Sequence, residues 1–230
     1  MGESMKSIMI SIQPQWVEKI LNGEKTIEIR KTMPKCELPC KVYIYCTQAK
    51  NVKENIWKVI DPLNQVKPFY SFDKFGSHKD VALNGKVVAE FTLNDVYKIG
   101  LADTWAKYGA WLLDEKRYLE DWEIEQILSG SRLSFDDMTD YLGYGDYETQ
   151  QFANGYCWHI DNLKIYDKPK ELSEFSHYIP NNKCPKMEGG IDCEDCMSYD
   201  SEHETCLALY YAHREIKRPP QSWCYVEELE

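Results

Sequence analysis

Three charged residues at fixed spacing, Lys25, Glu28 and Arg30, are the first candidates for chemistry in this 230-residue chain. They follow Gly23 in the stretch "LNGEKTIEIRK". A Lys amine whose pKa is lowered by burial beside a second cation can act as a base or a nucleophile. An Arg guanidinium held by a carboxylate can address a phosphate or a base edge. Spacing alone leaves two simpler alternatives open, a solvated Lys at a strand start and a surface ion pair worth ~0–1 kcal/mol.

A second candidate site is a group of four cysteines in the pattern Cys-x8-Cys-x2-Cys-x9-Cys. Zinc takes four soft ligands in a tetrahedron, and a Cys-x2-Cys turn presents two thiolates to one ion. Residues 187–206 hold seven acidic and no basic residues, which adds to the attraction for a cation. Unrelated thiols and a redox pair are the alternatives, and His203 or Cys224 can replace one ligand. The predicted ligands of a structural zinc are Cys184, Cys193, Cys196 and Cys206.

Aromatic side chains in the predicted strands form a third class of candidate, because they can stack on nucleic-acid bases, a contact worth ~1–3 kcal/mol per base. Trp158 is the preferred stacking residue. Its neighbour His159 carries a ring that can titrate near neutral pH. For both residues the alternative is a structural place in the core.

The charged motif is positioned by a strand, a helix and a second strand that the hydrophobic pattern predicts. The run "SIMISI" (7–12) is apolar and β-friendly. In "PQWVEKILNG" apolar residues recur at helical spacing, with Pro14 suited to the first turn and Gly23 to the end. "KTIEIR" then alternates as a strand, so that its two isoleucines face one side and Glu28 and Arg30 face the other.

The rest of the chain predicts a mainly β protein. Strands without regular βαβ alternation argue against a parallel doubly wound sheet. We expect one α+β domain, a small open β-barrel with peripheral helices. Further strands are expected at 41–48, 83–99, 156–166 and 218–229, a short helix at 52–60, a helical turn at 168–175, and mainly helical structure at 101–150 with a capping box at Ser134 and Asp137. The barrel core is assigned to 5–48, 83–100, 156–176 and 218–229, the insertions to 49–82 and 101–150, and the cysteine-rich segment to 184–206.

The formal net charge of −11 disfavours a protein that coats duplex DNA, because phosphate contacts need Lys and Arg. The negative charge is concentrated in 113–150, with a balance of −8, and in 187–206, with −7, so the remaining residues carry +4. This charge distribution is therefore still compatible with a basic pocket that binds a single strand, a loop or one nucleotide. The acidic segment 113–150 is either a solvated helical face or a surface for a basic protein partner.

Targeting and motif signals narrow the function classes. No run approaches the ~18 apolar residues of a membrane span. The first residues lack the basic start and apolar stretch of a signal peptide. We expect a soluble cytoplasmic protein with no membrane partner, and its nine cysteines as thiols or metal ligands rather than disulfides. Walker, Rossmann, HExxH and GxSxG motifs are absent from the sequence.

In its helix–strand setting, Gly23-x-Lys25-x-x-Glu28-x-Arg30 resembles the signature of the ASCH domain, whose β-barrel is related to the PUA domains that bind RNA. The resemblance extends to "KVYIYC", "GKVVAEFTLNDV", "GYCWHIDNLKIYDKPKELSEF" and "PPQSWCYVEEL", and is of the phage and prophage type. It implies a ligand pocket between the helix and the barrel, with the motif at its mouth. The expected ligand-binding residues are Gly23, Lys25, Glu28, Arg30, Lys31 and Trp158.

Three functional hypotheses follow. The first is binding of RNA or of a single, modified or unmodified, nucleotide. The second is hydrolysis of RNA or of a modified nucleoside, because one ASCH branch removes the acetyl group of N4-acetylcytidine with a Lys at the position of Lys25. That branch has Thr in place of Glu28, and Glu90 in "VVAEF" is the candidate for its further catalytic Glu. Lys25 would then be the base or nucleophile, assisted by Glu28 or Glu90. The third is a phage-encoded interaction protein that acts on a host factor through 113–150.

Overall fold

The structure, a computed structural model, describes residues 6–48, 50, 55–58, 66–68, 81–103, 107–149, 151–178, 199–200, 205–206 and 216–229. Within these residues the chain forms two larger β-sheets and two small ones, accompanied by three α-helices. The predicted fold class, α+β and mainly β, is confirmed. No helix of the described residues is long and apolar enough to cross a membrane.

The first sheet has the strand order β13-β7-β3-β1-β16. Its strands are β1 (Lys6–Ile12), β3 (Cys40–Cys46), β7 (Val87–Leu93), β13 (Asp161–Lys170) and β16 (Trp223–Glu227). β1 and β3 run parallel, and the other neighbours are antiparallel. β1 and β3 are almost wholly buried and rich in β-branched and aromatic residues, the composition that suits a pleated surface.

The second sheet has the strand order β10-β9-β8-β12-β2, with β11 beside β8. Its strands are β2 (Ile27–Arg30), β8 (Val96–Asp103), β9 (Ala110–Leu112), β10 (Arg117–Tyr118), β11 (Gly145–Asp146) and β12 (Ala153–His159). The strand that carries the charged motif, β2, therefore lies at one end of this sheet. All four of its residues are nevertheless buried.

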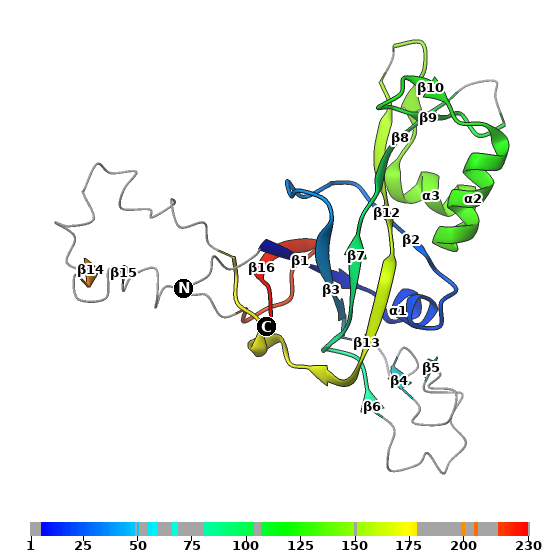
Figure 1. Ribbon diagram of the computed structural model, residues 1–230. Helices are drawn as coiled ribbons and strands as arrows, with labels where there is room; N and C mark the ends of the chain where they lie inside the picture. The colour runs from blue at the N-terminus through cyan, green and yellow to red at the C-terminus, as the bar shows by residue number, and fades with distance from the viewer. Residues whose placement is uncertain are drawn as a thin grey trace.

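A long two-stranded ribbon joins the two sheets. Only residues 94–95 separate β7 from β8, and only residue 160 separates β12 from β13. Because β7 pairs with β13 in the first sheet and β8 with β12 in the second, the same hairpin runs through both. Figure 1 shows this ribbon passing from the β13 side of the molecule to the β8 side. The described strands form open sheets that do not close on themselves.

Three helices complete the described core: α1 (Pro14–Leu21), α2 (Asp121–Ser131) and α3 (Phe135–Leu142). As predicted, α1 begins at Pro14, whose missing N–H is harmless in a first turn. Gly23, with φ of +73°, follows its end. The capping box of α3 is also confirmed, because Asp137 N donates to Ser134 Oγ at 3.0 Å and Ser134 N donates to the Asp137 carboxylate at 3.1 Å.

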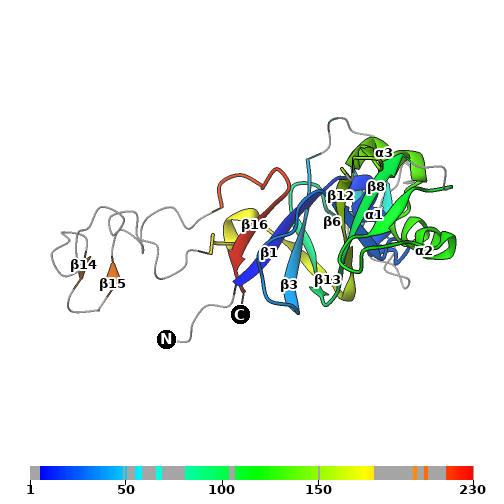
Figure 2. The same cartoon turned by 90° about the horizontal axis from the view of Figure 1, so that it is seen from above.

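The buried apolar residues form separate layers. One cluster lies between the first sheet and α1, and a second lies between α2, α3 and the strands β2, β8 and β12. A third cluster, around Tyr43 and Phe175, covers the opposite face of the first sheet. Figure 2 shows α2 and α3 beside β8 and β12, away from β16. The cavity described below lies where the first two layers meet.

Two sequence expectations need correction. The short helix expected at 52–60 is replaced over Ile56–Lys58 by strand β4, which pairs with β5 (Val66–Pro68) and β6 (Val81–Ala82). The described residues among 101–150 are not mainly helical, because β9 and β10 precede α2 and α3. The turn expected at 168–175 is a 3-10 helix over Leu172–Glu174. A two-stranded sheet of β14 (Tyr199–Asp200) and β15 (Thr205–Cys206) completes the described elements.

Candidate functional site

A cavity of about 900 Å³ opens where the two sheets meet. Four segments that are distant in sequence line it, 11–16, 25–30, 133–141 and 219–222, together with residues 47, 48 and 50. Its volume lies within the range of about 300–1,000 Å³ typical of small-molecule sites. The charged residues among its lining are Lys25, Glu28, Arg30, Lys50 and Asp137. Their formal charges sum to +1, in a chain whose net charge is −11.

The turn between α1 and β2 positions Lys25. The backbone N–H groups of Glu24 and Lys25 both donate to Lys19 O, at 2.8 and 3.0 Å. The next residue, Thr26, donates its N–H to Gly130 O of α2 at 2.8 Å. Because the ends of two helices hold this turn, the Lys25 side chain is directed inward and is only 3% exposed.

The ammonium group of Lys25 has an acceptor for each of its three protons. Nζ donates to Ile27 O and to Ser131 O, both at 2.8 Å, and lies 3.3 Å from Glu28 Oε2. Ser131 is the last residue of α2, and a helix C-terminus favours a cation. Burial lowers the pKa of Lys25, while the Glu28 carboxylate acts in the opposite direction. The geometry is that of a charged donor held in place.

Glu28 links Lys25 to Arg30, and we call the three side chains the charge chain. Glu28 Oε1 lies 2.9 Å from Arg30 Nε, in an ion pair that lacks hydrogen-bond alignment. Arg30 Nη2 donates to Ser11 O at 2.8 Å, and Nη1 contacts Ser222 Oγ at 3.4 Å. Arg30 therefore connects β2 of the second sheet to β1 of the first and to the segment before β16. The charge chain carries a net charge of +1.

Two aromatic residues that the sequence reasoning missed also line the cavity. Trp16 projects from α1 and is half-buried, with the centre of its ring 5.3 Å from Lys25 Nζ. Tyr141 comes from α3 and is 40% exposed. Burial raises the pKa of the Tyr141 phenol above its ordinary value of 10.0. Asp137, four residues before Tyr141 on the same helix, lines the cavity as well, but no sequence signal marks either residue as part of a site.

The structure brings Lys25, Glu28 and Arg30 together and leaves the other predicted site residues outside the cavity lining. Gly23 shapes the end of α1, and Lys31 is exposed, with Nζ 5.3 Å from the centre of the Tyr141 ring. Trp158 is fully buried, because its ring packs into the apolar cluster between the first sheet and α1. Its ring is not part of the cavity lining.

Glu90, the predicted second catalytic carboxylate, lies on β7 and belongs to a different cluster. Its Oε2 accepts a hydrogen bond from Tyr166 OH at 2.5 Å, and its Oε1 lies 3.3 Å from Lys164 Nζ. Burial alone would raise the pKa of Glu90, but these partners and Lys41 lower it. Glu90 is therefore held as a carboxylate outside the cavity lining.

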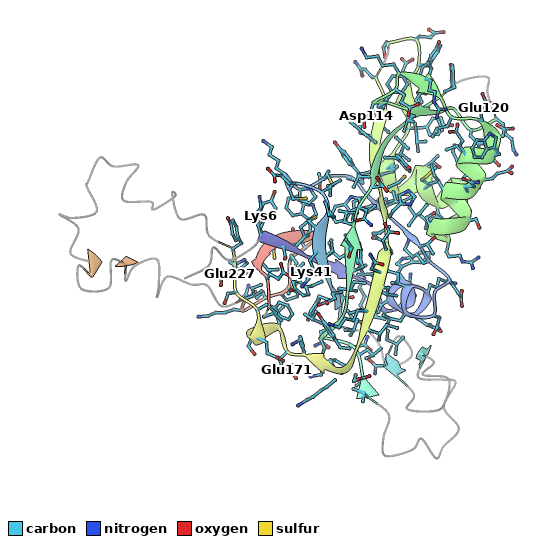
Figure 3. All side chains as sticks on the ribbon, viewed as in Figure 1. Lys6, Lys41, Asp114, Glu120, Glu171 and Glu227 are labelled. Atoms are coloured by element: carbon cyan, nitrogen blue, oxygen red, sulfur yellow. The ribbon has the colours of Figure 1, made fainter. Side chains whose placement is uncertain are left out.

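The other predicted features lie elsewhere. His159 contacts the Tyr97 ring edge-on, with 4.9 Å between ring centres, and both rings line a second hollow of about 280 Å³. Residues 113–149 of the acidic segment include β10, α2, α3 and β11, and Asp114 and Glu120 lie at the outer end of the second sheet (Figure 3). The side chains of the predicted zinc ligands, Cys184, Cys193, Cys196 and Cys206, lie outside the described residues.

Comparison with known proteins gives no sequence match, because no family model fits the chain and no curated protein matches it significantly. Similar solved structures include three crystal structures of ASCH proteins from Zymomonas mobilis. A serine-to-alanine mutant has a TM-score of 0.43 and 13% identity, over 96% of this chain and 89% of its own. A tyrosine-to-phenylalanine mutant has a TM-score of 0.41 and 14% identity, over 97% and 92%. A third structure has a TM-score of 0.38 and 14% identity, over 96% and 88%.

Proposed function

We propose that this protein binds a nucleotide in the cavity, either within single-stranded RNA or as a free nucleotide. The observation that carries the proposal is the buried charge chain, with net charge +1, in a cavity that two aromatic rings also line. Buried ionic groups are costly to desolvate, so their retention in a cavity wall is a mark of function. The sequence resemblance to the ASCH domain implies the same class of ligand.

Arg30 is the proposed phosphate contact. Its planar guanidinium has five N–H donors in a rigid fork, a geometry that matches phosphate oxygens. Three structural partners, Glu28, Ser11 and Ser222, fix its orientation from two sheets and one loop. A donor that is already oriented loses little side-chain entropy when a ligand binds.

Trp16 and Tyr141 are the proposed base contacts. They approach the cavity from different helices, α1 and α3, and both present aromatic surface to it. Unpaired bases are recognised by stacking on aromatic rings and by hydrogen bonds to their polar edges. Donors and acceptors for these edges are available in the lining amides Gln13, Gln15 and Gln48.

The charge distribution favours a small or single-stranded ligand. A duplex requires many phosphate contacts along its length, whereas the positive charge at this cavity is +1 and the adjacent segment 113–150 carries −8. A protein that neutralises one or two phosphates has a shallow salt dependence of binding. We therefore expect the affinity for a nucleotide to fall only slightly as salt rises.

A hydrolase is the second candidate, and the observation in its favour is the burial of Lys25 in the cavity wall, which lowers the pKa of its amine. A lysine nucleophile or base needs a free lone pair on Nζ. All three Nζ protons are instead matched by acceptors, and Glu90 is outside the cavity lining. Incubation with N4-acetylcytidine and with structured RNA, followed by mass spectrometry, tests this alternative. A product whose formation Lys25→Met abolishes would establish hydrolysis in place of simple binding.

Calorimetric titration with ribonucleoside 5′-monophosphates and with a short single-stranded RNA tests the proposed binding. Arg30→Met should weaken binding at least about tenfold, because charged hydrogen bonds are worth about 1.5–3 kcal/mol. Lys164→Met is the matched control, since Lys164 is an ion-paired but exposed cation outside the cavity lining. It should bind like the wild type. Circular dichroism verifies that both variants are folded. Equal affinity of wild type and folded Arg30→Met would overturn the proposal.

A further inference from the structure

Two cysteines outside the cavity lining face each other in the segment that leads from β2 into β3. Cys36 is half-buried, and Cys40, the first residue of β3, is 8% exposed. Their sulfur atoms are 3.2 Å apart. A disulfide bond is 2.03–2.05 Å long, so the two sulfurs need to approach by only about 1.2 Å more. Cys46, Cys157 and Cys224, the other cysteines with described side chains, show no such thiol contact.

We propose that Cys36 and Cys40 are a redox modification site, at which the two thiols form a reversible intramolecular disulfide on reaction with a low-molecular-weight disulfide. This inference does not depend on nucleotide binding, because neither cysteine lines the cavity.

The surrounding structure holds the pair in place. The backbone N–H of Lys35, next to Cys36, donates to Tyr225 OH of β16 at 2.6 Å. Lys35 O accepts from Tyr225 OH at 3.1 Å and from Lys6 Nζ at 2.7 Å. Lys6 lies at the start of β1 (Figure 3). Cys40 is fixed in the sheet by its pairing with Leu93 of β7. Both thiols are therefore positioned before any reaction, which raises their effective concentration for each other.

The reaction proceeds by two thiol–disulfide exchanges. Cys36, the more exposed thiol, loses a proton and attacks the oxidant, forming a mixed disulfide and releasing one small thiolate. Cys40 then loses its proton and attacks the Cys36 sulfur, releasing the second small thiolate. The two protein thiols give up two protons and two electrons, and the small disulfide is reduced to two thiols.

The environment of Cys40 suits the second step more than the first. Burial raises the pKa of the Cys40 thiol, and the contact with the Cys36 thiol raises it further. The nearby Lys6 ammonium acts in the opposite direction. Once Cys36 is in the mixed disulfide, its thiol no longer opposes ionisation of Cys40. The order of attack, Cys36 before Cys40, therefore follows from exposure and from this coupling.

Peptide mapping of the full chain gives a direct test. Trypsin cleaves after Lys35 and Lys41, so both cysteines lie in one peptide, "CELPCK", with no other cysteine. The protein is treated with oxidised glutathione, alkylated, digested and analysed by mass spectrometry. The expected product is this peptide lighter by two hydrogen atoms and without alkyl groups, and dithiothreitol should restore both alkylation sites. Cys224→Ser should react in the same way, whereas Cys36→Ser should leave Cys40 without an intramolecular partner.

A parallel reaction in concentrated urea measures what the fold contributes. The native protein should form the disulfide at least about tenfold faster than the unfolded chain, because the fold positions the two thiols. Three results would overturn the proposal: two alkylated thiols after oxidant treatment, a mixed disulfide with glutathione that does not resolve, or equal rates in the native and unfolded states.

Discussion

Replacement of Glu28 by Gln is the sharpest test of the charge chain, because it keeps the shape of the side chain and removes one charge. Glu28 is the only negative residue of the charge chain. Its carboxylate oxygens lie 3.3 Å from Lys25 Nζ and 2.9 Å from Arg30 Nε. Its side chain is 11% exposed, and those of Lys25 and Arg30 are 3% and 9% exposed. Glu28→Gln therefore leaves two buried cations close together without a counter-ion.

The expected loss of stability is about 3–5 kcal/mol, the range measured when one partner of a buried ion pair is removed. At an effective dielectric constant near 20, the attraction of Glu28 to each of the two cations is worth about 5 kcal/mol before desolvation. The cost of desolvating the buried charges offsets much of this attraction, so a net loss of about 3–5 kcal/mol is reasonable. The matched control is Glu24→Gln. Glu24 forms an exposed ion pair with Lys19 at 3.7 Å, for which a loss of about 0–1 kcal/mol is expected.

Urea denaturation followed by circular dichroism measures both variants. The pH dependence adds a second readout, because the pKa of Lys25 in the folded protein is lowered from the usual 10.5. At pH values between the lowered pKa of Lys25 in the folded protein and its pKa of about 10.5 in the unfolded chain, the unfolded chain binds more protons. The free energy of unfolding therefore rises with pH in this range. The penalty of Glu28→Gln should therefore shrink as Lys25 loses its charge. A Glu28→Gln variant as stable as Glu24→Gln at pH 7 would refute the reasoning.

Three further predictions follow from the described contacts. Lys25→Met should cost ~1–3 kcal/mol in urea denaturation, because two buried carbonyl acceptors lose their donor; wild-type stability would contradict this. Tyr141→Ala should weaken nucleotide binding in calorimetry by ~1–3 kcal/mol if its ring stacks on the base, and unchanged affinity would exclude that role. Arg117 and the backbone N–H of Glu120 together lower the pKa of Glu123 to about 2, so these contacts stabilise the fold above pH 4.5 and lose their effect as pH falls through 2. Glu123→Gln should cost ~1 kcal/mol or less at pH 7 and less still at pH 2, where about half of Glu123 is protonated in the folded protein, and an equal loss at both pH values would count against the pair.

Local sequence rules predict the part of the site that one short segment builds. The period of two along β2 places Glu28 and Arg30 on one face and the two isoleucines on the other, as the structure shows. Pro14 and Gly23 mark where α1 begins and where the chain leaves it. These features depend on residues within one or two turns of the chain, and such patterns are readable from a single sequence.

The remaining parts of the site depend on contacts between distant residues. Arg30 reaches Ser222, which lies 192 positions away, and Trp16 shares the cavity with Tyr141 from another helix. No local sequence pattern predicts these long-range contacts. Trp158 illustrates the same limit: a ring in a strand can face a ligand or the core, and only its packing against residues of the first sheet and α1 places this ring in the core.

Short strands were also difficult to predict. Strands β4, β9 and β10 have two or three residues each, too few for a period of two to be recognised. The mainly helical structure expected at 101–150 therefore left out β9 and β10. The contact between Cys36 and Cys40 cannot be predicted from the sequence either. A spacing of four residues in a non-helical segment predicts no particular distance between two side chains.

A crystal structure grown with a saturating ribonucleotide or a short single-stranded RNA is the most direct test of the central claim. We expect the ligand to occupy the cavity of about 900 Å³, with a phosphate or base edge on Arg30 and a base against Trp16 or Tyr141. Lys25 and Glu28 should keep their contacts with each other. An empty cavity in crystals that hold the nucleotide elsewhere on the protein would contradict the account.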